Sequence, residues 1–193
     1  MKEIRMVEMR ALEDEGMVVE GYAAVFDSVT DLGWMKEVID RNAFQGADMS
    51  DIVMKYNHED SVLPMARTRG GSLQFNVDDH GLKIRAKLPE TSVNKDIFTL
   101  IKEKVLSKMS FAFTVKTEEF DYDTDTRRIL AFDKIFDVSV VDVPAYESTE
   151  IYARNKEQYE KEKRQYEEQK EQHRKFELEK KKALAILKLQ NRF

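Results

Sequence analysis

The sequence predicts an α+β fold in which a strand-rich body is followed by one long helix. Residues 1–150 carry short β-prone runs that alternate with period two and are separated by turn residues. From about Glu147 onward the chain has no Gly or Pro, and charged, helix-forming residues dominate. A chain of 193 residues with 41% hydrophobic content suffices for one ordinary domain and an appendage. We therefore expect a domain over residues 1–150 and a charged helical tail over residues 151–193.

Two strands are expected in the first part of the body. The run MVVEGYAAVF, residues 17–26, is β-prone, and its Gly21 marks a bulge or a close approach of another backbone. The run DIVMKYNHED, residues 51–60, alternates so that Tyr56 and His58 share a face if the strand stays regular to its end. This pattern places His58 at a strand end.

A hairpin and a helix are predicted next. Two alternating runs within residues 70–89 flank Asp-Asp-His-Gly, which is a turn signal. Apolar residues within 92–105 recur at helical spacing, and Ser92 or Asn94 is expected to cap the helix. The expected apolar face consists of Ile97, Leu100, Ile101 and Val105.

Two further strands complete the predicted body. In VLSKMSFAFTV, bulky side chains such as Phe111 alternate with small ones such as Ser110, so the strand has a core face and a small polar face. By itself the small polar face is typical of a partly solvated strand. A turn at residues 121–126 then leads into a long strand, or two, within residues 127–146, which Pro144 is expected to close.

Composition excludes several kinds of chemistry. The chain has no cysteine, which excludes disulfides, thiolate catalysis and Cys-based zinc sites. Its histidines, His58, His80 and His173, are scattered and form no metal-ligand cluster, so no metal or cofactor is expected. No apolar run approaches the roughly 20 residues of a membrane span, and the N-terminus lacks the apolar centre of a secretion signal. We expect a soluble protein whose chemistry depends on Ser, His, Asp, Glu or Lys.

Charge is divided unevenly between body and tail. Residues 151–193 hold 13 Lys and Arg against eight Glu, whereas residues 1–150 hold 19 Lys and Arg against 29 Asp and Glu. The acidic body argues against nucleic-acid binding by the body. The basic tail is compatible with an acidic binding partner, but a helix that is simply exposed to solvent has the same composition. Ring-bearing side chains recur every seven residues along the tail, at Tyr152, Tyr159, Tyr166 and His173. This spacing is typical of a coiled coil, although a second apolar seam is missing, so we expect partner docking or weak self-association.

Ser110, His58 and Asp137 have the pattern that acyl transfer by serine requires. Such chemistry needs a hydroxyl, a base, oxyanion donors and usually a group that orients the base. His58 at its strand end is the best candidate base, although a structural histidine fits the same position. Asp137 and Ser139 share a small polar face, which lies on the Ser110 side of the sheet if both strands pack into one core. A solvent-facing acid gives the same pattern for Asp137, and His80 in the hairpin turn is the alternative third member.

Several segments, taken in order, resemble the prohead maturation proteases of tailed phages. They are EGYAAVFDS with DLGW and EVIDRNAF, then YNHED, MARTRGGSLQF with DDHGLKIRAKLP, MSFAF and FDVSVVDVPAYEST, and they span about residues 18–150. That family is similar in fold to the herpesvirus assemblin proteases, which implies a β-barrel with peripheral helices. The resemblance implies serine endopeptidase activity with Ser110 as nucleophile, His58 as base and Asp137 as its orienting residue. The herpesvirus enzymes place a second histidine in the strand of Asp137.

Some positions depart from the family pattern. The family often has Gly where this chain has Lys104 and Ala112. Residues 41–44 stand where the family often has Pro-Gly-Ala-Phe, and residues 65–67 replace a Leu-Gly-Arg motif. A side chain at Ala112 limits how closely another backbone can approach the nucleophile. Lys104 lies in the turn before the strand of Ser110, where the family's glycine would allow a wider range of backbone angles. None of these departures touches the three residues that the resemblance implies to be catalytic.

The resemblance also implies substrates and a location. The expected enzyme cleaves the scaffolding segment of the major capsid protein, and itself, inside the assembling procapsid in the host cytoplasm, with the tail docked on scaffold helices. The alternative is a non-enzymatic capsid-assembly or scaffold-binding module. A third interpretation is a binding domain whose basic tail contacts nucleic acid, for which the sequence has no stacking or reading motif.

Overall fold

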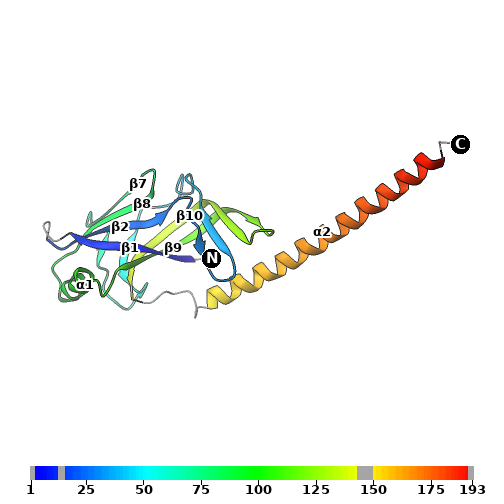
Figure 1. The fold of residues 1–193 in the computed structure, drawn as a ribbon. Coiled ribbons are helices and arrows are strands. Elements are labelled where there is room, and N and C mark those ends of the chain that lie inside the picture. The colour runs from blue at the N-terminus through cyan, green and yellow to red at the C-terminus, as the bar shows by residue number, and fades with distance from the viewer. Residues whose placement is uncertain (1–2, 13–15, 143–149, 191–193) are drawn as a thin grey trace. The chain divides into compact units, whose positions relative to one another are not determined.

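The computed structural model describes residues 3–12, 16–142 and 150–190. By contacts between residues, the chain divides into two compact units, Met1–Ser148 and Thr149–Phe193. The first unit consists mainly of strands, and the second contains one long helix (Figure 1). The predicted α+β class is therefore confirmed.

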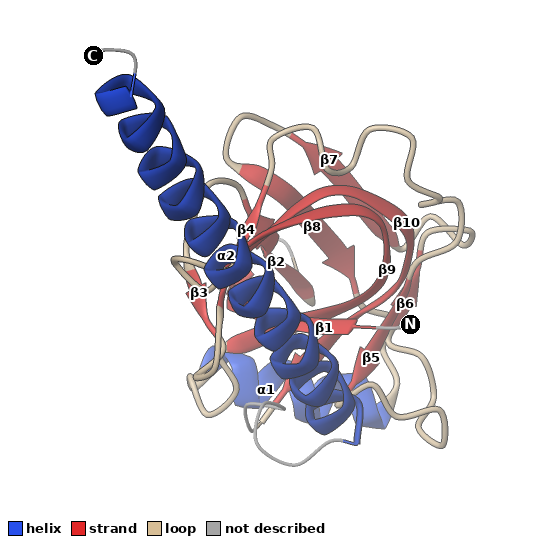
Figure 2. Ribbon diagram, turned by 90° about the vertical axis from the view of Figure 1, so that its right-hand side faces the viewer, coloured by secondary structure: helices blue, strands red, loops and turns tan. Residues whose placement is uncertain are grey.

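The first unit is built on one 10-stranded sheet that curls into a half-barrel (Figure 2). In chain order its strands are β1 (Glu3–Leu12), β2 (Val18–Val25), β3 (Thr30–Asp31), β4 (Lys36–Ile39), β5 (Val53–Tyr56), β6 (Ala66–Arg67), β7 (Leu73–Val77), β8 (Gly81–Lys87), β9 (Lys108–Asp121) and β10 (Thr126–Val141). The strands pair in the order β3-β4-β10-β9-β1-β2-β8-β7, and β5 pairs with both β10 and β6. Both β4 and β5 run parallel to β10, whereas the other pairs are antiparallel.

The core lies on the inner side of this sheet, against β9 and β10. Met109, Phe111 and Phe113 are fully buried, as their alternation along the sequence predicts. Phe132 from β10 packs edge-on against Phe111 and Phe113, with ring centroids 5.9 and 4.8 Å apart. The long strands are thus held in register by large side chains that pack on one face, which leaves the other face for smaller residues.

Two local predictions in the first part of the body are confirmed. A Cβ atom at Gly21 would lie 2.7 Å from the backbone oxygen of Glu8, so β1 approaches β2 too closely for any side chain at this position. The predicted hairpin forms from β7 and β8. Its turn is held by Asp78 Oδ1, which accepts hydrogen bonds from the backbone N–H groups of His80 and Gly81 at 2.9 and 3.1 Å.

Helix α1 (Ser92–Lys102) confirms the predicted helix but has a different cap and end. Thr91 is the N-cap in place of Ser92 or Asn94, because its side-chain oxygen accepts a hydrogen bond from the Asn94 N–H at 3.2 Å. The helix ends before Val105, which is 68% exposed and does not join the apolar face. Helix α1 lies at one end of the curled sheet (Figure 2).

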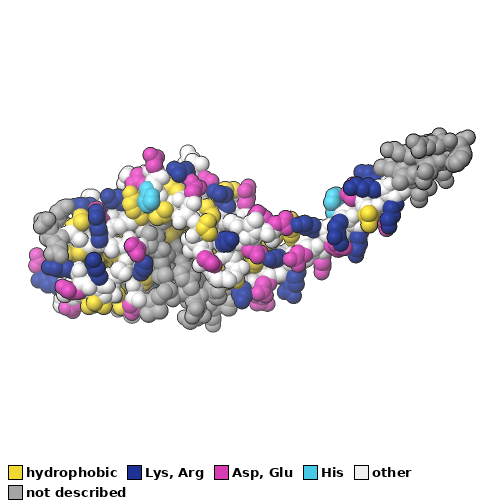
Figure 3. Space-filling model, in the orientation of Figure 1, with side chains coloured by type: hydrophobic (Ala, Val, Ile, Leu, Met, Phe, Trp, Pro, Cys, Tyr) yellow, Lys and Arg dark blue, Asp and Glu magenta, His cyan; other side chains and the backbone are white. Residues whose placement is uncertain are grey.

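Helix α2 (Glu150–Gln190) is the predicted long helix. Side chains of both charge signs are interspersed along its described part (Figure 3), and Glu171 pairs with Arg174 and Lys175 at 2.9 and 3.7 Å. No helix within the described residues combines the length and the apolar character that crossing a membrane requires. Pro144, expected to close the preceding strand, lies outside the described residues.

A buried ion pair joins β4 to β10 at the end of the sheet. Glu37 and Arg127 have side chains 1% and 6% exposed, and Arg127 donates to Glu37 Oε2 at 3.0 Å. Arg127 also pairs with Glu118, which is 35% exposed. Charges of this kind are stable in the interior only when they are paired.

We expect Glu37→Gln to lower the free energy of unfolding by about 3 kcal/mol, because it removes the buried carboxylate that pairs with Arg127. Urea denaturation measures the change. Glu118→Gln is the matched control and should cost under about 1 kcal/mol, since Glu118 is partly solvated. Equal losses in the two variants would show that burial does not strengthen the Glu37 interaction.

Candidate active site

Strands β9 and β10 bring Ser110, Asp137 and Ser139 to one face of the sheet. In the antiparallel register Ser110 lies directly opposite Ser139, and Ala112 lies opposite Asp137. Residues directly opposite one another, and residues two apart on one strand, share a face. The Ser139 hydroxyl donates to Asp137 Oδ1 at 3.1 Å. The prediction that Asp137 and Ser110 lie on the same side of the sheet is therefore confirmed.

A turn at the end of β5 directs His58 toward this face. Strand β5 runs beside β10 with Tyr56 opposite Val140, and the Asn57 N–H donates to the Val140 carbonyl at 2.9 Å. The chain then leaves strand geometry, because Asn57 and His58 have φ angles of 50° and 59°. His58 therefore does not continue the alternation of β5. Instead, its Nδ1 atom is hydrogen-bonded to Asp137 Oδ1.

The turn that carries His58 is braced by Asp142, the residue that follows β10. The Tyr56 hydroxyl donates to Asp142 Oδ2 at 2.9 Å, and the Asp142 N–H donates to the Asn57 side-chain oxygen at 3.2 Å. The hydrogen bond to the carboxylate raises the pKa of Tyr56 above its ordinary value. Non-glycine residues with positive φ are uncommon and persist where the surroundings hold them. These contacts supply that support for Asn57 and His58.

Burial decides between the alternatives that the sequence left open for Asp137 and Ser110. The two residues are 1% and 0% exposed, so Asp137 is not a solvent-facing acid and Ser110 does not lie on a solvated face. A buried carboxylate is costly unless hydrogen bonds compensate it. Asp137 receives such bonds from His58 and Ser139.

Two buried polar atoms at this face have no hydrogen-bond partner in the described structure, namely His58 Nε2 and Ser110 Oγ. Because a carboxylate only accepts hydrogen bonds, the contact with Asp137 places the proton of neutral His58 on Nδ1 and leaves Nε2 as an acceptor. Buried polar atoms without partners are rare, and each calls for an explanation such as a catalytic role or a bound water. The face thus holds an imidazole nitrogen acceptor and a hydroxyl, neither of which has a hydrogen-bond partner among the described residues.

His80, the alternative third member, belongs to another part of the sheet. It lies in the β7–β8 turn and packs edge-on against Tyr22 of β2, with ring centroids 4.5 Å apart. Strands β9, β1 and β2 separate β8 from β10 in the pairing order. The structure joins His58 to Asp137 and does not place His80 with them.

Two residues that support this site were not given a role from the sequence. Ser139 was placed on the polar face, but its hydrogen bond to Asp137 was not foreseen. Asn57 precedes His58 in the chain, and the sequence alone gives it no role. The sequence does contain a hint for each residue. Asp137 and Ser139 are two residues apart, so on a strand they lie on the same face. Asn is among the residues that most readily adopt a positive φ.

The positions that depart from the family pattern also lie near functional elements. Lys104 precedes β9 and has a φ of 58°, which explains why glycine suits this position. Ala112 is fully buried and opposite Asp137, where a small side chain is needed. In the described residues, no group of three or more His, Asp or Glu side chains is arranged to hold a metal ion.

Comparison with known families matches the chain to the caudovirus prohead serine proteases over residues 5–175. The match extends beyond residues 18–150 on both sides and includes nearly all of β1 and more than half of α2. No curated protein and no solved structure gives a significant match. Since the matched segment covers most of the chain, the protein belongs to the caudovirus prohead serine protease family and is a serine protease of prohead maturation.

Proposed function

We propose that Ser110, His58 and Asp137 are the catalytic residues of this protease and that Ser139 positions Asp137. The observation that carries the proposal is the run of contacts from Ser139 through Asp137 to His58, which ends at an unpaired Nε2 atom. The buried, unpaired hydroxyl of Ser110 lies on the same face of the sheet. Residues 1–150 are then the catalytic domain and residues 151–193 an accessory helix.

The chemistry follows from the roles of these atoms. Ser110 Oγ attacks the carbonyl carbon of the scissile peptide while His58 Nε2 takes its proton, and the proton then passes to the leaving amine. Asp137 holds the Nδ1–H tautomer and stabilises the imidazolium that forms. Water then attacks the carbonyl carbon of the acyl-enzyme while His58 Nε2 takes its proton. The proton passes to Ser110 Oγ as the carboxylic acid product leaves. Backbone N–H groups are the expected donors to the oxyanion.

The proposed substrates are the scaffolding segment of the major capsid protein and the protease itself, within a procapsid in the host cytoplasm. Family membership supports this assignment, since these serine proteases act on proheads. The full burial of Ser110 supports an activity that depends on a rearrangement, because a substrate must reach the hydroxyl. The curled, strand-dominated sheet supports the relation in fold to the herpesvirus assemblins.

Co-expression with the capsid protein tests the substrate assignment. After procapsids have formed, the intact masses of the capsid protein and of this chain are measured. Discrete truncations of both are expected, and their masses locate the cleavage sites. Full-length capsid protein in procapsids that contain the protease would contradict the assignment of this substrate.

The described part of α2 supports a docking role for the tail. Phe176 and Leu178 are 62% and 54% exposed on a helix that is otherwise mostly charged. We expect deletion of the residues after Arg154 to reduce incorporation of the protease into procapsids at least roughly tenfold, since a helix face that docks on a partner contributes several contacts. Quantitative immunoblotting of purified procapsids measures this. The full-length and shortened chains should both carry Ser110→Ala, so that self-cleavage does not remove the tail, and equal incorporation would exclude docking by α2.

A further inference from the structure

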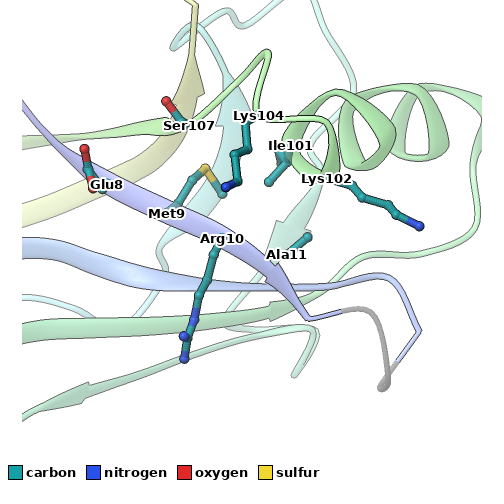
Figure 4. Close-up of a pocket in the computed structure, with 8 residues that line it drawn as sticks. All are labelled: Glu8, Met9, Arg10, Ala11, Ile101, Lys102, Lys104 and Ser107. Carbon is teal, nitrogen blue, oxygen red and sulfur yellow. The ribbon is translucent and has the colours of Figure 1, made fainter.

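A groove between β1 and α1 lies apart from the proposed catalytic residues. Its volume is about 470 Å³. One wall is the β1 segment from Glu8 to Ala11, and the other is formed by Ile101 and Lys102 of α1 with Lys104 and Ser107 of the following connection (Figure 4). None of Ser110, His58 and Asp137 lines it.

The groove exists because β1 changes its neighbour halfway along its length. Residues Glu3–Glu8 pair with β9, whereas Met9–Leu12 pair with β2 on the opposite side. The last hydrogen bond on the β9 side joins the Met9 N–H to the Ser107 carbonyl at 3.0 Å. On that side the remaining part of β1 faces α1 and its connection to β9, and no strand lies beside it within the described residues.

The backbone of Ala11 is the open part of this edge. In an antiparallel ladder, successive residues direct their N–H and C=O groups to alternate sides. Because the Met9 N–H points toward Ser107, the Arg10 groups point toward β2 and the Ala11 groups point toward the groove. Among the described residues, no hydrogen bond satisfies Ala11 on this side. An open strand edge of this kind is a template on which an extended peptide can add.

The side chains of the groove favour a peptide of negative charge. Lys104 reaches between β1 and α1 toward Met9 (Figure 4), and it forms no ion pair within the described residues. Lys102 and Arg10 extend outward from the two walls (Figure 4), and Arg10 is paired with Glu20 at 2.6 Å. The acidic residue Glu8 is already neutralised by Lys108 at 2.8 Å. Lys104 is therefore the cation that the groove offers to a ligand, beside the apolar side chains of Met9 and Ile101.

We propose that the groove binds an extended peptide with acidic side chains. The peptide adds as a strand to the edge at Ala11 and directs a carboxylate toward Lys104. Main-chain hydrogen bonds to β1 supply affinity, and Lys104 selects for acidic sequences. This binding goes beyond the proposed catalytic function, because it requires none of the proposed catalytic residues.

Binding is tested with the full-length chain carrying Ser110→Ala and a fluorescein-labelled peptide of four Val-Glu repeats. Fluorescence anisotropy measures the Kd. Lys104→Glu should weaken binding at least roughly tenfold, since an attraction becomes a repulsion. Lys116→Glu makes the same charge change at an exposed site of β9 outside the groove, and it should change the Kd less than about twofold. Lys104→Gly suits the positive φ, removes the whole side chain without introducing a negative charge and should also weaken binding.

Two further measurements distinguish strand addition from nonspecific electrostatic attraction of an acidic peptide. A Val-Glu peptide with N-methyl groups at alternate residues lacks half of its hydrogen-bond donors and should bind at least roughly tenfold more weakly. In NMR spectra the backbone amides of Ala11 and Ser107 should shift on binding, and that of His58 should not. Absence of binding, equal binding of the N-methylated peptide, or equal losses in the Lys104 and Lys116 variants would overturn the proposal. Shifts confined to the amide of His58 would overturn it too.

Discussion

Ser110→Ala is expected to lower the rate of peptide cleavage by roughly 10⁶-fold, because it removes the atom that attacks the carbonyl. The fold should survive this change. The Ser110 hydroxyl is buried without a hydrogen-bond partner, so alanine removes a polar atom that contributes no contact and leaves almost the same shape. The free energy of unfolding should therefore stay within about 1 kcal/mol of the native value, or rise.

Intact masses after co-expression with the capsid protein measure the first effect, and urea denaturation measures the second. The matched control is Ser28→Ala, at an exposed position outside both the proposed catalytic residues and the groove, which should leave cleavage unchanged. Retained truncation in Ser110→Ala would exclude Ser110 as the nucleophile. Loss of cleavage together with a large loss of stability would mean that the hydroxyl is needed for the fold instead.

Asp137→Asn is expected to reduce kcat/KM for a cleavable peptide by roughly 10⁴-fold, which is the size of effect found when the orienting carboxylate of a serine protease becomes an amide. Asparagine has nearly the same volume as aspartate, so the buried site is filled. It no longer carries the charge that stabilises protonated His58. Its amide group can also donate to Nδ1, which would move the proton to Nε2 and prevent this atom from acting as a base.

The pH profile of kcat/KM separates this role from a structural one. If Asp137 holds the tautomer of His58, the variant should regain part of its activity at high pH, where hydroxide replaces the base. Ser139→Ala should have a smaller effect, roughly tenfold, because it removes one of two hydrogen bonds to Asp137 Oδ1. Equal losses in the two variants, with unchanged pH profiles, would show that Asp137 acts only in packing.

The local patterns of the sequence predicted β2, β5, β7, β8, β9, β10 and the long helix, since alternation and helix propensity act over a few residues. They did not predict β1 or the short strands β3, β4 and β6. They also placed Ser110 and Asp137 on one face, because side-chain direction follows from parity along a strand. The position of His58 depends on distant partners instead. Strand β5 pairs with β10 across more than 80 residues, and the turn at Asn57 departs from strand geometry without a glycine to signal it.

The buried ion pair could not be predicted from the sequence for a similar reason. Glu37 and Arg127 look like solvent-facing residues in the sequence, because each is polar and their pairing crosses 90 residues. Only the parallel alignment of β4 and β10 brings them together. The open edge of β1 could not be predicted either. Nothing in the residues around Ala11 indicates that the strand changes its neighbour there.

The register between β9 and β10 connects the timing of proteolysis to folding. A slip of one residue would exchange Ser110 with Phe111, turning the serine into the core and the ring out of it. The large packing energy of the phenylalanines therefore penalises every slip by an odd number of residues, which would turn the serine to the other face. With the proposed role of Ser110 as nucleophile, an incompletely folded chain would lack an assembled active site, and proteolysis would have to follow folding.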